Sequence, residues 1–196
     1  MKKTSDFLKG MGKAFEIFRT IVNAVLDIGG NDSDLERILT DTDLCKQIAG
    51  LVVKTKKSIC VNYAIPFTNM IGMGKYDWVN ENITAEHFPI TGSGKSEVDF
   101  QFVHLNKLAS SEEVLLHMEK NNLRPATLAE LLAFGAKYPE IQREFPIVAL
   151  GSFWINGDGI RLVLYLGKDN SKRFLNLYWF DRDWSGDWRF LAVQKV

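Results

Sequence analysis

The pattern of apolar and polar residues divides the chain into two parts. Residues 5–28 carry apolar side chains at every third or fourth position, which is the spacing of one face of an amphipathic helix. Two shorter stretches with helical spacing follow at residues 32–39 and 41–54, and each has Asp or Ser available to cap its start. We therefore predict a helical N-terminal segment over residues 1–57.

From residue 58 onward the pattern becomes typical of strands and turns. Val98, Phe100 and Phe102 alternate with polar residues, which predicts a half-buried strand. Four more strands are predicted over residues 147–154, 160–167, 173–180 and 189–196, separated by polar turns. Two short helices are expected before them, opened by capping boxes at Ser110 and Thr127. This order predicts an α+β protein with a second domain over residues 58–196.

Composition narrows the class of partner. The 196 residues include 24 basic and 24 acidic side chains, with no formal net charge, so the chain lacks the basic surface of a general nucleic-acid binder. No apolar run approaches the roughly 20 residues that cross a bilayer, and charges interrupt the N-terminus where a signal peptide is apolar. We expect no nucleic-acid partner and no membrane span, with a cytoplasmic location by default. The sequence leaves the oligomeric state open.

Motifs for catalysis or metal binding are absent from the sequence. TGSGKSE at residues 91–97 resembles a phosphate-binding loop, but Pro89 stands where that motif requires glycine, and the segment leads into a predicted strand. The three histidines are far apart in sequence, and neither Cys45 nor Cys60 has the surroundings of a catalytic cysteine. We expect no catalytic residue, no metal site and no cofactor.

Aromatic residues concentrate near the C-terminus, where residues 177–193 read LYWFDRDWSGDWRFLAV. In the predicted strand at residues 173–180, side chains alternate between the two faces, so one set is directed toward a core and the other toward a contact surface. The core set is Leu175, Leu177 and Trp179, and the contact set is Phe174, Asn176, Tyr178 and Phe180. We also expect Trp184 and Phe190 in the core. Tyr178, Trp188 and the polar turn residues are expected to be exposed for binding.

Three sequence blocks carry a resemblance to a known family. They are LRPATLAELLAF at residues 123–134, VALGSFW at 148–154 and WFDRDWSGDWRFLAVQK at 179–195. Together they resemble the C-terminal part of a C-type lectin-fold domain. They are similar, more narrowly, to variable proteins of diversity-generating retroelements, which are related in fold to formylglycine-generating enzymes. The likeness covers about residues 97–196 and implies small antiparallel sheets with two short helices, preceded here by the N-terminal helices.

The resemblance also implies a mechanism of diversification. In that family a reverse transcriptase copies a template repeat with errors at adenines, so that codons of the C-terminal repeat are rewritten and the fold displays the resulting side chains to a ligand. The matching residues are Asn176, Tyr178, Asp181, Arg182, Asp183, Ser185, Gly186, Asp187 and Trp188, with Trp154, Tyr165, Lys168 and Phe174 as neighbours. Trp188 departs from the pattern, because an asparagine codon becomes a tryptophan codon only with changes beyond adenines.

These observations predict a noncatalytic, hypervariable protein that recognises a protein or cell-surface ligand. The enzyme branch of the fold relies on C-terminal cysteines, whereas both cysteines of this chain precede residue 61. An alternative is a metal-dependent small-molecule enzyme or binding protein that uses Asp181, Asp183 and Asp187. A third hypothesis makes residues 1–57 a module for oligomerisation or docking.

Overall fold

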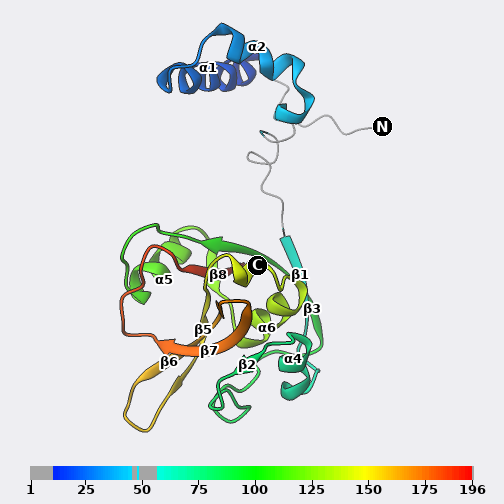
Figure 1. Cartoon of the computed structure of the whole chain (residues 1–196), viewed down its shortest axis with the longest axis vertical. Coiled ribbons are helices and arrows are strands. Elements are labelled where there is room, and N and C mark those ends of the chain that lie inside the picture. Colours follow the sequence, from blue (N-terminus) through cyan, green and yellow to red (C-terminus); the bar gives the residue numbers. More distant parts are fainter. Residues whose placement is uncertain (1–10, 46–47, 49–56, 196) are drawn as a thin grey trace. The chain divides into compact units, whose positions relative to one another are not determined.

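The computed structural model describes residues 11–45, 48 and 57–195 (Figure 1). The chain divides into two compact units, Met1–Thr55 and Lys56–Val196. Within the described residues, no helix has both the length and the apolar character to cross a membrane.

The first unit contains the predicted helices. Helix α1 spans Met11–Asp27 and α2 spans Asp32–Thr40. The cap of α2 is Asn31 rather than Asp or Ser, and its side chain accepts the N–H of Ser33 at 2.9 Å. Residues 42–45 and 48 are also helical, and the Asp41 carboxylate accepts the N–H of Leu44 at 2.9 Å. The rest of the third predicted helix, and residues 5–10 of the first, lie outside the described residues.

Eight strands of the second unit form one sheet. They are β1 (Lys57–Asn62), β2 (Trp78–Val79), β3 (Lys95–Val103), β4 (Leu123–Pro125), β5 (Ile147–Ile155), β6 (Arg161–Asp169), β7 (Lys172–Trp179) and β8 (Arg189–Gln194). The order is β1-β3-β8-β5-β6-β7-β2, with β4 paired to β8. Neighbouring strands run antiparallel, except that β5 pairs with β8 and β2 pairs with β7 in the parallel direction.

The α+β class is confirmed, but the expectation of several small antiparallel sheets is wrong. The last strand of the chain, β8, lies between β3 and β5 and pairs with both. It therefore joins the β1–β3 pair to the β5–β6–β7 meander. The five strands predicted between residues 97 and 196 are all present, each within a few residues of its predicted bounds.

Three helices and one short 3-10 helix accompany the sheet, namely α4 (Phe67–Met73), α5 (Ser111–Lys120), α6 (Leu128–Lys137) and η2 (Ile141–Arg143). The predicted capping box of α5 is confirmed, because the Ser110 hydroxyl accepts the N–H of Glu113 at 3.2 Å and Glu113 accepts the N–H of Ser110 at 3.0 Å. At the start of α6, the Glu130 carboxylate accepts the N–H of Thr127 at 2.8 Å.

Alternate residues of the central strands enter two separate cores, one on each face of the sheet. On β6, Leu164 and Leu166 pack with α6 and α4, whereas Val163 packs with α5. We call these the α6 face and the α5 face. The α6 face holds the larger cluster, which includes Leu131 and Phe134 of α6.

Two buried polar groups fix the α6 face. Glu130 is 1 % exposed and accepts two hydrogen bonds from Arg124, at 2.6 and 2.9 Å, and one from the Tyr63 hydroxyl at 3.3 Å. Burial by itself raises the pKa of Glu130, but the hydrogen bonds from Arg124 and Thr127 outweigh burial, and the pKa lies below its usual value. The carboxylate is therefore ionised and ties the start of α6 to β4.

Arg173 is the second buried group, and it anchors β7. Its guanidinium donates to the carbonyl oxygens of Gly74 at 2.9 Å and Gly135 at 3.0 Å, and to the side chain of Gln142 at 2.8 Å. The ring of Tyr76 lies 5.2 Å from this guanidinium. A single strand position thus connects α4, α6 and η2 to β7, the strand that carries much of the predicted ligand site.

Candidate ligand-binding surface

Partly exposed aromatic rings cover the α5 face over β6 and β7. Tyr165 of β6 lies across from Asn176 of β7, and its ring centroid is 5.6 Å from that of Phe174 and 5.1 Å from that of Trp188. The rings of Tyr178 and Trp188 are 5.3 Å apart. We call Tyr165, Phe174, Asn176, Tyr178 and Trp188 the aromatic surface; each of the five is intermediate in exposure.

Trp184 supports these rings from beneath. It is 1 % exposed, and its ring centroid lies 4.9 Å from Trp188 and 5.1 Å from Tyr178. Its indole N–H donates to the Ser111 hydroxyl at 2.8 Å, and Ser111 donates to the carbonyl of Phe180 at 2.6 Å. Backbone hydrogen bonds also join Trp184 to Ala109 in both directions. The loop of residues 181–188 is therefore pinned at its middle to the start of α5.

Side-chain amides hold the outer edge of the aromatic surface. Asn80, which follows β2, donates to the Asn176 oxygen at 2.8 Å, and Asn176 donates to the Tyr165 hydroxyl at 3.2 Å. Burial raises the pKa of Tyr165, so its hydroxyl remains protonated near neutral pH. These bonds fix the orientation of Asn176 and Tyr165 before any ligand arrives.

The polar residues on either side of Trp184 are exposed. Asp181, Arg182, Asp183, Ser185 and Asp187 all project from the loop into solvent. Asp181 forms an ion pair with Arg161 of β6, whereas the Arg182 guanidinium lies 3.8 Å from the centroid of the Trp179 ring. The loop that leads to Trp188 thus displays charges of both signs.

Close packing of the loop against the backbone of Asn106 favours glycine at position 186. A Cβ atom at this position would lie 3.2 Å from the backbone carbon of Asn106. The ring nitrogen Nε2 of His104 also lies 2.7 Å from the Gly186 carbonyl oxygen. Larger residues here would push the loop away from the segment that follows β3.

Eleven of the thirteen predicted site residues lie either on the aromatic surface or in the 181–188 loop that ends in it, and the structure places the other two elsewhere. The ring of Trp154 lies on the α6 face and stacks on His87, with ring centroids 3.9 Å apart and planes 8° apart. Lys168 is exposed at the end of β6, and strand alternation directs it to the face opposite Tyr165.

Two expectations for the aromatic residues are wrong and two are confirmed. Trp179 was expected in the core but is 41 % exposed, because β7 ends there and its ring meets Arg182 instead of a helix. Phe180 was expected on the contact surface but is only 6 % exposed, because it follows the end of the strand and enters the α5-face core. Trp184 and Phe190 are buried as predicted.

Sequence reasoning missed Asn80 and Ser111, which orient the surface and its supporting loop. They lie 96 and 73 residues before the partners they contact. No local pattern marks either residue, since Asn80 is in an irregular segment and Ser111 reads as an ordinary first residue of a helix.

The aspartates of the loop do not form a ligand cluster. Across the described part of the chain, no three side chains of His, Cys, Asp or Glu come close enough to hold a metal ion. Rings with fixed orientation, amide groups and exposed charges are instead suited to noncovalent recognition. No match to this chain was found among protein-family models, curated proteins or solved structures.

Proposed function

We propose that the protein is a noncatalytic binding protein whose aromatic surface and 181–188 loop recognise a protein or cell-surface ligand. The observation that carries this proposal is the partly exposed ring cluster of Tyr165, Tyr178 and Trp188 resting on the buried Trp184. Rings that are already packed lose little conformational freedom when a ligand covers them. Tyr and Trp are also the side chains most enriched at the energetic centres of protein interfaces.

The charged rim adds specificity to this proposed site. Asp183 and Asp187 are exposed on the loop on either side of the buried Trp184, and Arg182 lies over Trp179 at the end of β7. Charges at the edge of an interface steer encounter and reject wrong partners more than they add affinity. The ligand should therefore present an apolar group for the rings and basic groups for the aspartates.

We further propose that the second unit is a C-type lectin-like domain and that a retroelement diversifies its loop. The resemblance of the three sequence blocks is the basis for both proposals. The proposal that the loop is diversified has further support from the loop itself. Its structural residue Trp184 is buried, whereas Asp181, Asp183, Ser185 and Asp187 are exposed. Exposed positions of this kind accept many side chains at a cost of about 0.5 kcal/mol or less.

A capture experiment with matched tryptophan variants tests the binding site. The purified chain is crosslinked to surface proteins of the source cells, and Trp188→Ala is compared with Trp179→Ala. Both variants lose an accessible indole, but only Trp188 belongs to the aromatic surface. We expect Trp188→Ala to weaken capture by about 30-fold, the effect of an interface hot spot. Trp179→Ala removes only the ring under the rim residue Arg182 and should weaken capture by about threefold or less.

Folding must be measured alongside capture, because Trp188 also contacts Trp184. Far- and near-ultraviolet circular dichroism should show that Trp188→Ala keeps the native fold. Equal capture by the wild type and Trp188→Ala would place the ligand elsewhere and contradict the proposed site. Equal loss in both tryptophan variants would indicate nonspecific adhesion of exposed indoles.

A further inference from the structure

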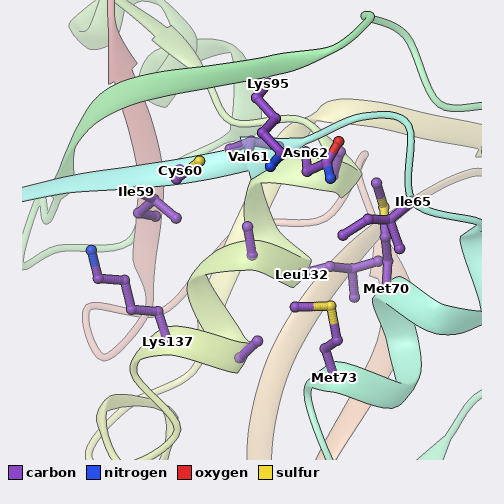
Figure 2. A pocket seen from close by; sticks show the side chains of 13 residues that line it. Ile59, Cys60, Val61, Asn62, Ile65, Met70, Met73, Lys95, Leu132 and Lys137 are labelled. Carbon is purple, nitrogen blue, oxygen red and sulfur yellow. The ribbon is translucent and has the colours of Figure 1, made fainter.

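An apolar groove opens beside the edge strand β1, far along the strand order from the aromatic surface. Its volume of about 510 Å³ is that of a small-molecule site. Figure 2 shows Met70 and Met73 of α4 and Leu132 of α6 across from Ile59 and Val61 of β1. Met73 is 55 % exposed, whereas the other four are buried. The groove is thus an opening into the core of the α6 face, and we call it the β1 groove.

The lining of the groove is aliphatic. Ala129, Ala133 and Ala136 recur at helical spacing, so they share one face of α6 with Leu132. Their short side chains explain why the space beside β1 is not filled. The methionines of α4 are unbranched and flexible, so they can adapt to the shape of a ligand. The lining contains no aromatic ring and no Asp or Glu, which favours an aliphatic ligand.

The edge of β1 offers little to an added peptide strand. In the β1–β3 ladder, the carbonyl groups of Ser58 and Asn62 point away from β3, and both already accept hydrogen bonds. The Ser58 carbonyl accepts from the Lys137 side chain at 2.8 Å, and the Asn62 carbonyl accepts from the N–H of Ile65 at 3.3 Å. The groove is therefore suited to a ligand that contacts side chains and needs no backbone pairing.

Lys137 places an ammonium group at one end of the groove. It lines the groove from the last turn of α6 and reaches the start of β1 at Ser58. An ammonium has three N–H donors, and the bond to Ser58 uses one of them. Among residues 57–195, no carboxylate forms an ion pair with Lys137. It can therefore donate to an anionic ligand and keep its bond to β1.

Lys95 also lines the rim, but it is not equivalent to Lys137. It pairs with Asn62 at the other end of β1. Strand alternation places it on the same face of β3 as Glu97 and Asp99. Its charge is therefore offset by carboxylates on that face, and Lys137 is the better anchor for an anionic group.

We propose that the β1 groove binds a free alkyl monocarboxylate, that is, a medium-chain fatty acid. The alkyl chain lies between β1 and the two helices, against Met70, Met73 and Leu132, and the carboxylate accepts a hydrogen bond from the Lys137 ammonium. Small-molecule sites commonly combine a mainly apolar lining with a few polar groups that fix the orientation of the ligand. The proposal does not depend on the aromatic surface.

The first test follows the methionine methyl groups of the full chain by nuclear magnetic resonance during a titration with decanoate. Met70 and Met73 line the groove, whereas Met118 lies in the core of the α5 face and is an internal control. We expect the signals of Met70 and Met73 to shift with a Kd of about 0.1 mM. The Met118 signal should stay in place. Octanoate should bind more weakly, by up to about fourfold for each methylene removed.

A ligand of opposite charge tests the role of Lys137. Decyltrimethylammonium has a similar alkyl chain and should bind at least about fivefold more weakly than decanoate. Lys137→Met keeps an apolar side chain but removes the ammonium, and it should weaken decanoate by about fivefold, the effect of an exposed ion pair. Lys168→Met, at an exposed position on β6, is the matched control and should leave the affinity unchanged.

A filled groove should exclude the ligand. Ala133→Leu extends a branched side chain into the space beside β1, so decanoate should bind at least about tenfold more weakly. Ala85→Leu adds the same side chain at an exposed position outside the groove and is the control. Circular dichroism should show the native fold in both variants. If Ala133→Leu does not fold, the comparison of Lys137→Met with Lys168→Met decides.

Three results would overturn the proposal. One is that the Met70 and Met73 signals do not move with decanoate up to about 1 mM. Another is equal affinity for decanoate and decyltrimethylammonium, which would indicate nonspecific adsorption of alkyl chains. The third is a shift of the same signals when the protein alone is diluted, which would make the groove an interface between copies of the chain.

Discussion

The two faces of the sheet are covered in different ways. On the α6 face, two helices pack over the strands, and buried polar groups such as Glu130 and Arg173 tie those helices to the sheet. On the α5 face, a helix covers one part, and the strands β6 and β7 are covered by their own aromatic rings and by a loop. We therefore expect the α6 face to contribute mainly to the stability of the fold.

The difference shows how a fold can keep aromatic rings partly exposed without burying them in the core. A helix over β6 and β7 would bury Tyr165 and Tyr178 completely. A loop pinned by one buried tryptophan supports the rings from one side and leaves the other side open. Variants that alter one face at a time can show how much the α6 face and the α5 face each contribute to the stability of the fold.

The largest effect is expected for Trp184→Ala, which removes the support of the α5 face. This ring is fully buried and donates a hydrogen bond to Ser111. Truncation of a buried Trp costs about 3 to 5 kcal/mol of unfolding free energy, measurable by denaturant titration. Trp179→Ala is the control, because its exposed ring should contribute about 1 kcal/mol or less through Arg182. Similar losses in the two variants would mean that the loop has no special support.

Glu130→Gln weakens the α6 face by a smaller amount. It leaves the partly exposed Arg124 without its carboxylate, and we expect a loss of about 2 to 3 kcal/mol at neutral pH. The folded-state pKa of Glu130 is lowered, so its ionised form stabilises the fold fully above the unfolded pKa of about 4.3. That contribution disappears as the pH falls through the lower, folded-state pKa.

The pH dependence separates charge from shape in this variant. Denaturant titrations of the wild type and Glu130→Gln should show a constant difference in unfolding free energy near neutral pH. The difference should shrink below about pH 4. A difference in unfolding free energy that persists unchanged in acid would show that Glu130→Gln acts by disturbing packing, not by removing the ion pair.

The smallest expected effect distinguishes two tyrosines of the α6 face. Burial raises the pKa of Tyr76, and its hydroxyl has no hydrogen-bond partner among the residues that the structure describes. Tyr76→Phe removes an unsatisfied group and should stabilise the fold by about 1 kcal/mol. Tyr63→Phe removes a donor to Glu130 and should destabilise it by about 1 kcal/mol. Thermal unfolding of both variants checks the opposite signs.

Sequence patterns predicted five of the eight strands and two of the three α-helices that the structure describes in the second unit, because these elements show clear local spacing. Strands β1, β2 and β4 and helix α4 were missed, because they are short or lie in segments without a regular pattern. The alternation of Val98 and Phe100 is visible in the sequence, and both side chains are buried. The single sheet was not predictable in this way, since β8 joins strands that are far apart in sequence. Exposure at strand ends also escapes local reasoning, as the reversed positions of Trp179 and Phe180 show.

The candidate site was predictable in its main residues but not in its supports. Tyr178 and Trp188 stand out as aromatic side chains in a polar context. Asn80 and Ser111 come from distant segments, and only the fold brings them to Asn176 and Trp184. Trp154 was misplaced because the shift in register between β5 and β6 changes which side chains share a face.

The central claim is that the fold displays a diversified surface, and the gene itself tests it most directly. Sequencing of the surrounding locus would compare the codons for residues 150–196 with any nearby, nearly identical repeat. We predict a neighbouring reverse transcriptase and mismatches only at template adenines, within codons of exposed or half-exposed residues such as Asn176, Tyr178 and Asp183. A locus without such a repeat, or mismatches that fall on Trp184 and Phe190, would contradict the claim.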